Sequence, residues 1–296
     1  MKRLRRATRP LRHGLAWGVL QGLAGALRLL PLPLALGLGA LLGRLVGQVA
    51  VADRRRVRSA LAACLEHPPS VGACFADLGR RVAELINARR MLALVVVDPA
   101  ALACWEAARA AGRGVLVATL HLGNWELMAA ALAAHGVPVV AVGARRQAGP
   151  LFRWLARLRA DLGVQVLGPG QGRAALRSLQ AGETVAFFVD QATRERSRWV
   201  PFFGRPAPVP ETLERLQQAS GAPVLLVWSV RRGRTHMVHA EAIPGARPLD
   251  VITARAEALV RADPTQWVWQ HARWTGPQRA APRRRNAGIA ERLQRR

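Results

Sequence analysis

The stretch Val115-Leu-Val-Ala-Thr-Leu-His121-Leu-Gly-Asn-Trp-Glu126 joins a continuous apolar run to a polar turn. The run Val115–Leu120 is short and apolar throughout, which predicts a strand buried on both faces. Gly123 permits a tight turn and Asn124 is a good helix N-cap, so a helix is expected from Asn124 to Ala134. The stretch therefore predicts a strand–turn–helix unit, which is a building block of α/β folds.

Apolar runs and helical segments alternate along the rest of the chain. Strands are expected at residues 138–143, 164–167, 184–190, 223–230 and 236–243. Helices are expected at residues 53–92, where a break falls at 67–70, and at 98–111, 150–162, 172–180, 211–220 and 251–261. A long arginine-rich loop is expected after Asp190. This alternation predicts an α/β fold with a mostly parallel central sheet and helices on both faces. Ligands of such sheets bind beyond the carboxyl ends of the strands, where His121 and Asp190 both lie.

His121 and Glu126 stand five residues apart at the junction of strand and helix. One imidazole nitrogen can take a proton from a hydroxyl while a carboxylate accepts the N–H of the other nitrogen and selects the tautomer. We therefore expect His121 to act as a general base and Glu126 to hold its ring. The plain alternative is a polar residue at a strand end and an acid in the first turn of a helix.

Asp190 and Gln191 close an apolar strand. Because an unpaired buried carboxylate is costly, we expect Asp190 to meet an arginine or the substrate, with a helix or loop cap as the alternative. The glycine-rich residues 168–172 precede a helix and could cradle a phosphate, although a simple strand-to-helix turn is the better interpretation.

The charge balance is strongly basic. The 296 residues include 44 Lys and Arg against 18 acids, giving a net charge of +26, and Lys2 is the only lysine. Such a surface suits an anionic membrane or phosphorylated substrates; we expect no nucleic acid, since no nucleic-acid-binding motif is recognisable. The three cysteines lack metal-type spacing and are odd in number, which predicts no metal site and fits a reducing compartment.

The N-terminal segment is basic over residues 2–12 and then apolar. Two apolar segments, residues 14–30 and 34–52, are separated by Pro31 and Pro33, and each is near the length that spans a bilayer. Arginines at 54–58 follow, and basic clusters on both sides favour cytoplasmic flanks. We expect a helical hairpin or helices in the membrane interface; the alternatives are two buried helices of a soluble protein and a cleaved signal ending at Ala26.

Four sequence blocks occur together in a characteristic order. They are His121-Leu-Gly-Asn-Trp-Glu126, residues 182–191 (GETVAFFVDQ), residues 200–204 (VPFFG) and residues 264–273 (PTQWVWQHAR). In order and spacing they resemble the lipid A biosynthesis (lauroyl/myristoyl-type) acyltransferases of the bacterial inner membrane. Differences from that pattern at residues 59–61, 205–210, 272 and 274 indicate a divergent member.

This resemblance implies a glycerolipid-acyltransferase-like domain at residues 53–276, after a membrane-anchoring segment at 1–52 and before a basic tail at 277–296. It implies a cofactor-free O-acyltransferase on the cytoplasmic side of the inner membrane. The acyl chain would move from an acyl thioester, usually acyl carrier protein, to a hydroxyl of a lipid A-type glycolipid. Transfer to another glycolipid or a lysophospholipid is an alternative, as is a non-catalytic basic protein that binds membrane or nucleic acid.

The resemblance also implies roles for individual residues. His121 and Glu126 match the catalytic block, and Arg159 lies close to a functional arginine of the family, with Arg157 and Arg153 as competitors. Substrate-binding roles are expected for Arg159, Asp190, Gln191, Asn124, His271 and Arg273, although His271 and Arg273 could equally orient the C-terminal segment.

Overall fold

A seven-stranded mixed sheet forms the centre of the computed structural model, which describes residues 18, 21–143, 149–168, 170–191 and 196–274. The strand order is β1-β9-β8-β2-β5-β3-β4, and every neighbouring pair is parallel except the β8–β9 hairpin. The strands are β1 (Val95–Val97), β2 (Val115–Thr119), β3 (Val139–Val142), β4 (Gln165–Leu167), β5 (Thr184–Phe188), β8 (Val224–Arg232) and β9 (Thr235–Ile243). The predicted mostly parallel sheet is confirmed.

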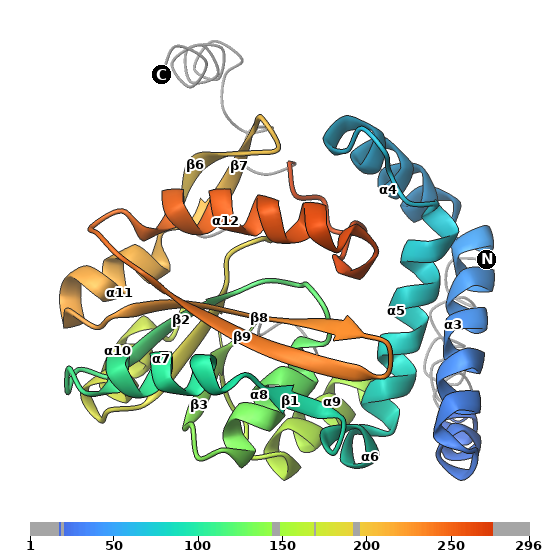
Figure 1. The fold of residues 1–296 in the computed structure, drawn as a ribbon, viewed down its shortest axis with the longest axis horizontal. Coiled ribbons are helices and arrows are strands. Elements are labelled where there is room, and N and C mark those ends of the chain that lie inside the picture. The colour runs from blue at the N-terminus through green and yellow to red at the C-terminus, as the bar shows by residue number, and fades with distance from the viewer. Residues whose placement is uncertain (1–17, 19–20, 144–148, 169, 192–195, 275–296) are drawn as a thin grey trace, which may run out of the picture.

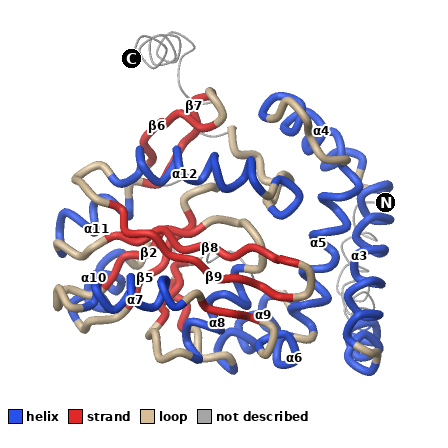
Figure 2. The backbone as a smooth tube through the Cα atoms, in the orientation of Figure 1, coloured by secondary structure: helices blue, strands red, loops and turns tan. Residues whose placement is uncertain are grey.

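Helices cover both faces of this sheet (Figures 1 and 2). Alternate side chains of β2 point to opposite faces, so Leu116 and Ala118 join one apolar cluster while Val115 and Val117 join another. The first cluster includes side chains of the helices α10 (Gly172–Gln180), α11 (Thr212–Ser220) and α12 (Pro248–Ala262). The second cluster includes side chains of the helices α7 (Pro99–Arg109), α8 (Trp125–Ala134) and α9 (Pro150–Asp161). Burial on both faces explains the uninterrupted apolar sequence of β2.

The helices α3 (Leu32–Val49), α4 (Val51–Cys64), α5 (Val71–Ile86) and α6 (Ala88–Leu92) lie between the helical residues 21–29 and the first strand of the sheet. In Figure 1, α3 and α5 stand side by side at the edge where β8 ends. Their backbones approach closely, because a Cβ added at Gly43 or Gly79 would collide with the backbone of the facing helix. This close contact ties α3 to the domain that carries the sheet.

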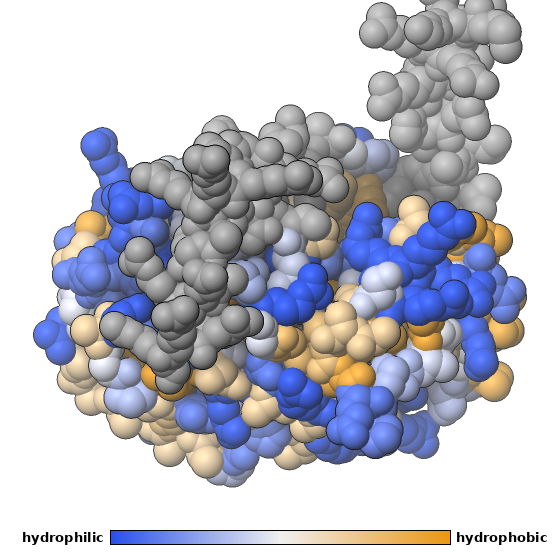
Figure 3. Space-filling model, turned by 90° about the horizontal axis from the view of Figure 1, so that it is seen from above, coloured by the Kyte–Doolittle hydropathy of each residue, from blue (hydrophilic) through white to orange (hydrophobic). Residues whose placement is uncertain are grey.

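The outer face of α3 is apolar and exposed. Among the described residues, α3 is the one helix long and apolar enough to cross a bilayer, and most of it is not buried in the protein. Its exposed apolar residues are Leu34, Leu38, Leu41, Leu42, Leu45, Val46 and Val49. The space-filling view shows hydrophobic side chains along the right-hand rim, where α3 lies, and a mixture of hydrophilic and hydrophobic side chains over the rest of the coloured surface (Figure 3). This face is consistent with membrane association.

The structure corrects the sequence interpretation after Asp190. The expected long loop contains an antiparallel hairpin of β6 (Ser197–Phe202) and β7 (Arg205–Pro210). Its prolines at 206, 208 and 210 occupy every second position, and Pro206 lies opposite Pro201. The missing N–H groups therefore fall on one edge of β7, and the intervening residues pair with β6.

Some segments discussed from the sequence lie partly or wholly outside the described residues. The basic stretch 2–12 and the tail at 277–296 lie outside the described residues, as do residues 14–17, 19 and 20 of the first apolar segment. The rest of that segment is described, and its residues 21–29 are helical, as expected. Strand β1 was not expected from the sequence, since three residues are too few for a periodic pattern.

Candidate active site

His121 and Asp190 meet where two neighbouring strands end. β2 and β5 are parallel with Thr119 opposite Phe188, so the residues two positions beyond each strand come together. The Asp190 carboxylate lies 2.8 Å from Nδ1 of His121. It also accepts hydrogen bonds from the backbone N–H of His121 at 2.7 Å and from the indole N–H of Trp267 at 2.8 Å. Three donors thus converge on one buried carboxylate.

These contacts keep Asp190 ionised. Burial by itself would raise the pKa of this carboxyl group, but the charge and hydrogen bonds of His121, together with Trp267, lower it to about 2. An ionised Asp190 accepts the N–H at Nδ1 of His121, which leaves Nε2 as the nitrogen that can take a proton.

The expectation that Glu126 holds the imidazole ring is wrong in this structure. Glu126 accepts two hydrogen bonds from the guanidinium of Arg159, at 2.8 Å and 2.5 Å, and one from the indole of Trp125 at 3.1 Å. The physical reason is the turn at Gly123 (φ 59°), after which Glu126 lies in the first turn of α8 and faces α9 rather than the strand end. Asp190 contacts the imidazole of His121 rather than an arginine, because the parallel neighbours β2 and β5 end side by side.

Arg159 is the arginine at the site, rather than Arg157 or Arg153. Burial would lower the pKa of the Arg159 guanidinium, but its hydrogen bonds to Glu126 and the charge of that carboxylate raise it. The bidentate pair positions a cation and an anion beside Trp125, whose ring lies edge-on to His121 at 4.9 Å.

Aromatic rings surround the imidazole of His121. Phe188 stacks on it at 4.0 Å, and His271 meets it edge-on at 4.5 Å. Burial, followed by the nearby charge of His121, lowers the pKa of His271 to about 4, so His271 is neutral at pH 7. The structure therefore brings His271 to the site as a neutral imidazole whose buried Nδ1 has no partner among the described residues.

Three other expected substrate-binding residues have different surroundings. Arg273 is buried and donates to the carbonyls of Pro208 and Val189, so it ties the C-terminal segment to β7 and to the end of β5. Burial lowers its pKa to about 10. Asn124 is also buried and uses both ends of its amide inside the protein, whereas Gln191 is exposed. In this structure Arg273 and Asn124 thus hold other parts of the protein in place.

A buried ionic network on α5 holds the loop between β2 and α8. Arg81 donates to the carbonyl of Gly123 at 3.0 Å, and the fully buried Glu84 accepts from the amide of Asn124 at 3.0 Å. Arg231 donates to Glu84 at 3.1 Å and also pairs with Asp77. Sequence analysis missed this network, because charged residues spaced three or four apart on a helix usually indicate a solvated face.

Glu84 is the ionised carboxylate at the centre of this network. Burial would raise the pKa of Glu84, but His236, whose Nε2 lies 3.1 Å from the carboxylate, lowers it together with Arg231 and Asn124, to about 2. An ionised Glu84 therefore anchors the helix-capping residue of the loop that carries His121.

An apolar pocket opens beside the Glu126–Arg159 pair. It lies between the sheet and helices α8 and α9, and its lining includes Trp125 and Phe188. Further lining residues are Val117, Met128, Leu132, Val139, Ala141, Val164 and Val166. Such a lining suits a hydrocarbon chain rather than a polar substrate. Among the described residues, no group of His, Cys, Asp or Glu could hold a metal ion.

Nearly the whole chain matches one known protein family. A search of curated proteins finds no match. The family model described as bacterial lipid A biosynthesis acyltransferase matches residues 1–275, nearly the whole chain, and these residues include His121, Asp190 and the pocket beside them. The chain therefore belongs to the bacterial lipid A biosynthesis acyltransferase family.

Proposed function

We propose that this acyltransferase moves a fatty acyl chain from acyl carrier protein to a hydroxyl of a lipid A-type glycolipid, with His121 as the general base. The observation that supports it most directly is the 2.8 Å contact between His121 Nδ1 and the ionised Asp190. Asp190 replaces Glu126 as the group that orients the imidazole.

The chemistry needs only these groups. Nε2 of His121 takes the proton of the acceptor hydroxyl while the oxygen attacks the thioester carbonyl. The C–S bond then breaks, and the imidazolium returns the proton to the departing thiolate. Asp190 stabilises the imidazolium in between, and base catalysis of this kind accelerates reactions by about 10²–10⁴. No acyl-enzyme is required, because the thioester is already activated.

The apolar pocket is our candidate for the site of the acyl chain. Trp125 and Phe188 line the pocket and also contact His121, so a chain in the pocket would have its carbonyl near the base. The Glu126–Arg159 pair, which lines the same pocket, would position polar atoms of donor or acceptor.

The surroundings of the site suit a lipid acceptor and an acidic carrier. The apolar face of α3 would hold the enzyme at the inner membrane, with the site on the cytoplasmic side. The net charge of +26 would attract both the anionic membrane and an acidic carrier protein.

The test is mass spectrometry of lipids from cells that lack the protein, complemented with wild type, His121→Ala or His239→Ala. His239 is the matched control, because it lies on β9 and pairs with Asp98 at the N-terminus of α7. We expect one acyl chain of the lipid A fraction to return with wild type and with His239→Ala, but not with His121→Ala. If His121→Ala also restored the acyl chain, His121 would not be the general base. If the acyl chain were lost from another lipid only, the acceptor would not be a lipid A-type glycolipid.

A further inference from the structure

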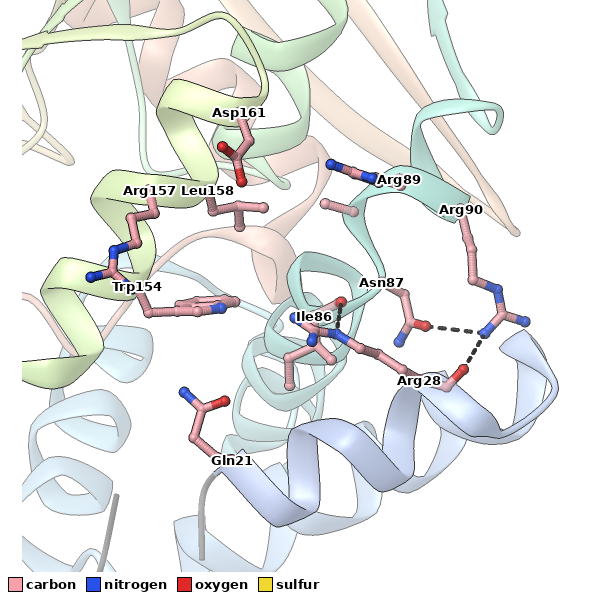
Figure 4. A pocket seen from close by; sticks show the side chains of 11 residues that line it. Gln21, Arg28, Ile86, Asn87, Arg89, Arg90, Trp154, Arg157, Leu158 and Asp161 are labelled. Atoms are coloured by element: carbon pink, nitrogen blue, oxygen red, sulfur yellow. Dashed lines mark hydrogen bonds between the residues drawn. The ribbon is translucent and has the colours of Figure 1, made fainter. Parts of the chain in front are cut away.

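A groove of about 550 Å³ lies outside the catalytic centre, between the helical residues 21–29, the junction of α5 and α6, and α9 (Figure 4). Its apolar lining includes Ile86, Trp154 and Leu158. The groove is thus made by three segments far apart in the sequence, and the ring of Trp154 points into it (Figure 4).

The charge of this groove is unbalanced. Four arginines line it, Arg28, Arg89, Arg90 and Arg157, against a single carboxylate, Asp161. Among the described residues, none of these five side chains forms an ion pair, although many other arginines of the protein do. Guanidinium groups gathered without counter-charges repel one another, and an anion in the groove would relieve that repulsion.

Two of the arginines are already held in place. Arg28 donates through Nε to the carbonyl of Ile86 at 3.2 Å, and Arg90 donates through Nη1 to the carbonyl of Leu30 at 3.0 Å. Nη1 of Arg90 also donates to Oδ1 of Asn87 at 3.1 Å and to the carbonyl of Arg28 at 3.3 Å (Figure 4). These bonds immobilise each guanidinium, and no hydrogen bond to another described residue engages Nη1 or Nη2 of Arg28, or Nε or Nη2 of Arg90. Arg89 and Arg157 make no hydrogen bond to other described residues and are exposed. Pre-organised and free donors together suit a group with several acceptor oxygens, which is the chemistry of a phosphate.

The position of the groove identifies the kind of molecule that would carry the phosphate. Leu30, which accepts from Arg90, directly precedes Pro31 and the apolar helix α3. Leu23 and Leu29, on the helical segment that borders the groove, are exposed as well. Cations beside exposed apolar side chains match the boundary between headgroups and acyl chains of a bilayer. We propose that this groove binds the phosphate of an anionic lipid headgroup.

The phosphate could belong to the acceptor or to a phospholipid of the membrane. In the first case the groove would orient the acceptor, because α9 carries Arg157 on the groove and Arg159 at the catalytic centre. In the second case the groove would hold the enzyme at the bilayer. Both share the same chemistry, and only the first rests on the proposed function.

Binding of dioctanoyl phosphatidic acid to the full-length protein in a neutral detergent tests the proposal without any acyl transfer. Dioctanoylglycerol, which has the same chains and no phosphate, is the matched ligand. The variant is Arg89→Gln/Arg157→Gln, and the control is Arg173→Gln/Arg215→Gln, which removes the same charge from a different groove. We expect the Kd for phosphatidic acid to rise about tenfold or more in the first variant, to stay unchanged in the control, and to be competed by inorganic phosphate.

Equal affinity in wild type and Arg89→Gln/Arg157→Gln would overturn the proposal, as would an equal loss in both double variants. An increase in KM for acyl carrier protein alone, with lipid binding unchanged, would also overturn it and identify a protein-docking surface instead. If lipid binding weakens in Arg89→Gln/Arg157→Gln, the KM of this variant for acceptors with and without a phosphate shows which molecule the groove binds. A rise in KM for the phosphorylated acceptor alone indicates that the groove binds the acceptor. An unchanged KM for both indicates that it binds a membrane phospholipid. If wild type binds phosphatidic acid but transfers no acyl chain, the proposed function is refuted and the proposal that the groove binds a lipid phosphate is still supported.

Discussion

Asp190→Asn is the substitution that tests the catalytic arrangement most directly. The change keeps the size of the side chain but removes the charge that pairs with His121 at 2.8 Å. It also replaces a pure acceptor by an amide that can donate to Nδ1, which would place the ring proton on Nε2, the nitrogen that must act as the base.

The size of the effect follows from the geometry. Two unit charges about 4 Å apart attract by about 4 kcal/mol at an effective dielectric constant of about 20. Each loss of about 1.4 kcal/mol in transition-state stabilisation slows the reaction about tenfold. We therefore expect kcat to fall by roughly three orders of magnitude, with little change in KM, because Asp190 is buried behind the imidazole.

The assay is steady-state transfer of labelled acyl chains from acyl carrier protein to the acceptor, with thermal unfolding as a check that the variant is folded. The double variant His121→Ala/Asp190→Asn should be no slower than His121→Ala, because both residues act through one imidazole. An Asp190→Asn enzyme within tenfold of wild type would refute the reasoning. So would a larger loss of kcat in Glu126→Gln, which would make Glu126 the partner of the ring after all.

Four further predictions concern the residues around this pair. Glu126→Gln leaves Arg159 without its carboxylate, and kinetics should show a rise in KM with a smaller fall in kcat; an unchanged KM would argue against a role in substrate positioning. Glu84→Gln weakens the hold on Asn124, and it should lower kcat with little effect on KM, whereas a loss of thermal stability with normal kcat would show a purely structural role. The folded-state pKa of about 2 for Glu84 lies below its ordinary value of 4.5, so this residue stabilises the fold above pH 4.5 and its contribution is lost as the pH falls toward 2. Denaturant unfolding between pH 3 and pH 7 should show that the free energy of unfolding falls toward low pH, and this fall should be smaller in Glu84→Gln. Ala141→Met fills part of the apolar pocket, and competition between acyl donors should show a shift toward shorter chains; an unchanged preference would place the chain elsewhere.

Local patterns in the sequence predicted most of the fold. The uninterrupted apolar run at β2 indicated burial on both faces, and the alternation of strands and helices indicated a parallel sheet, because these features depend on residues close together in the chain. Gly123 and Asn124 likewise marked the turn and the cap of α8. The hairpin β6–β7 was missed, since its prolines suggest a loop until a partner strand is known.

Local sequence patterns were sufficient to predict that His121 and Asp190 each follow a strand, and that Arg159 and Glu126 lie on helices. Which of these side chains meet depends on how the strands and helices pack. His121 pairs with Asp190 because β2 and β5 are neighbours in a defined register, and Glu126 pairs with Arg159 because α8 and α9 lie on the same face of the sheet. The burial of Glu84 and Arg81 was decided in the same way, since a charged helical stripe looks the same in sequence whether it faces water or a catalytic loop. Strand order and helix packing depend on contacts between distant parts of the chain, and local patterns do not specify those contacts.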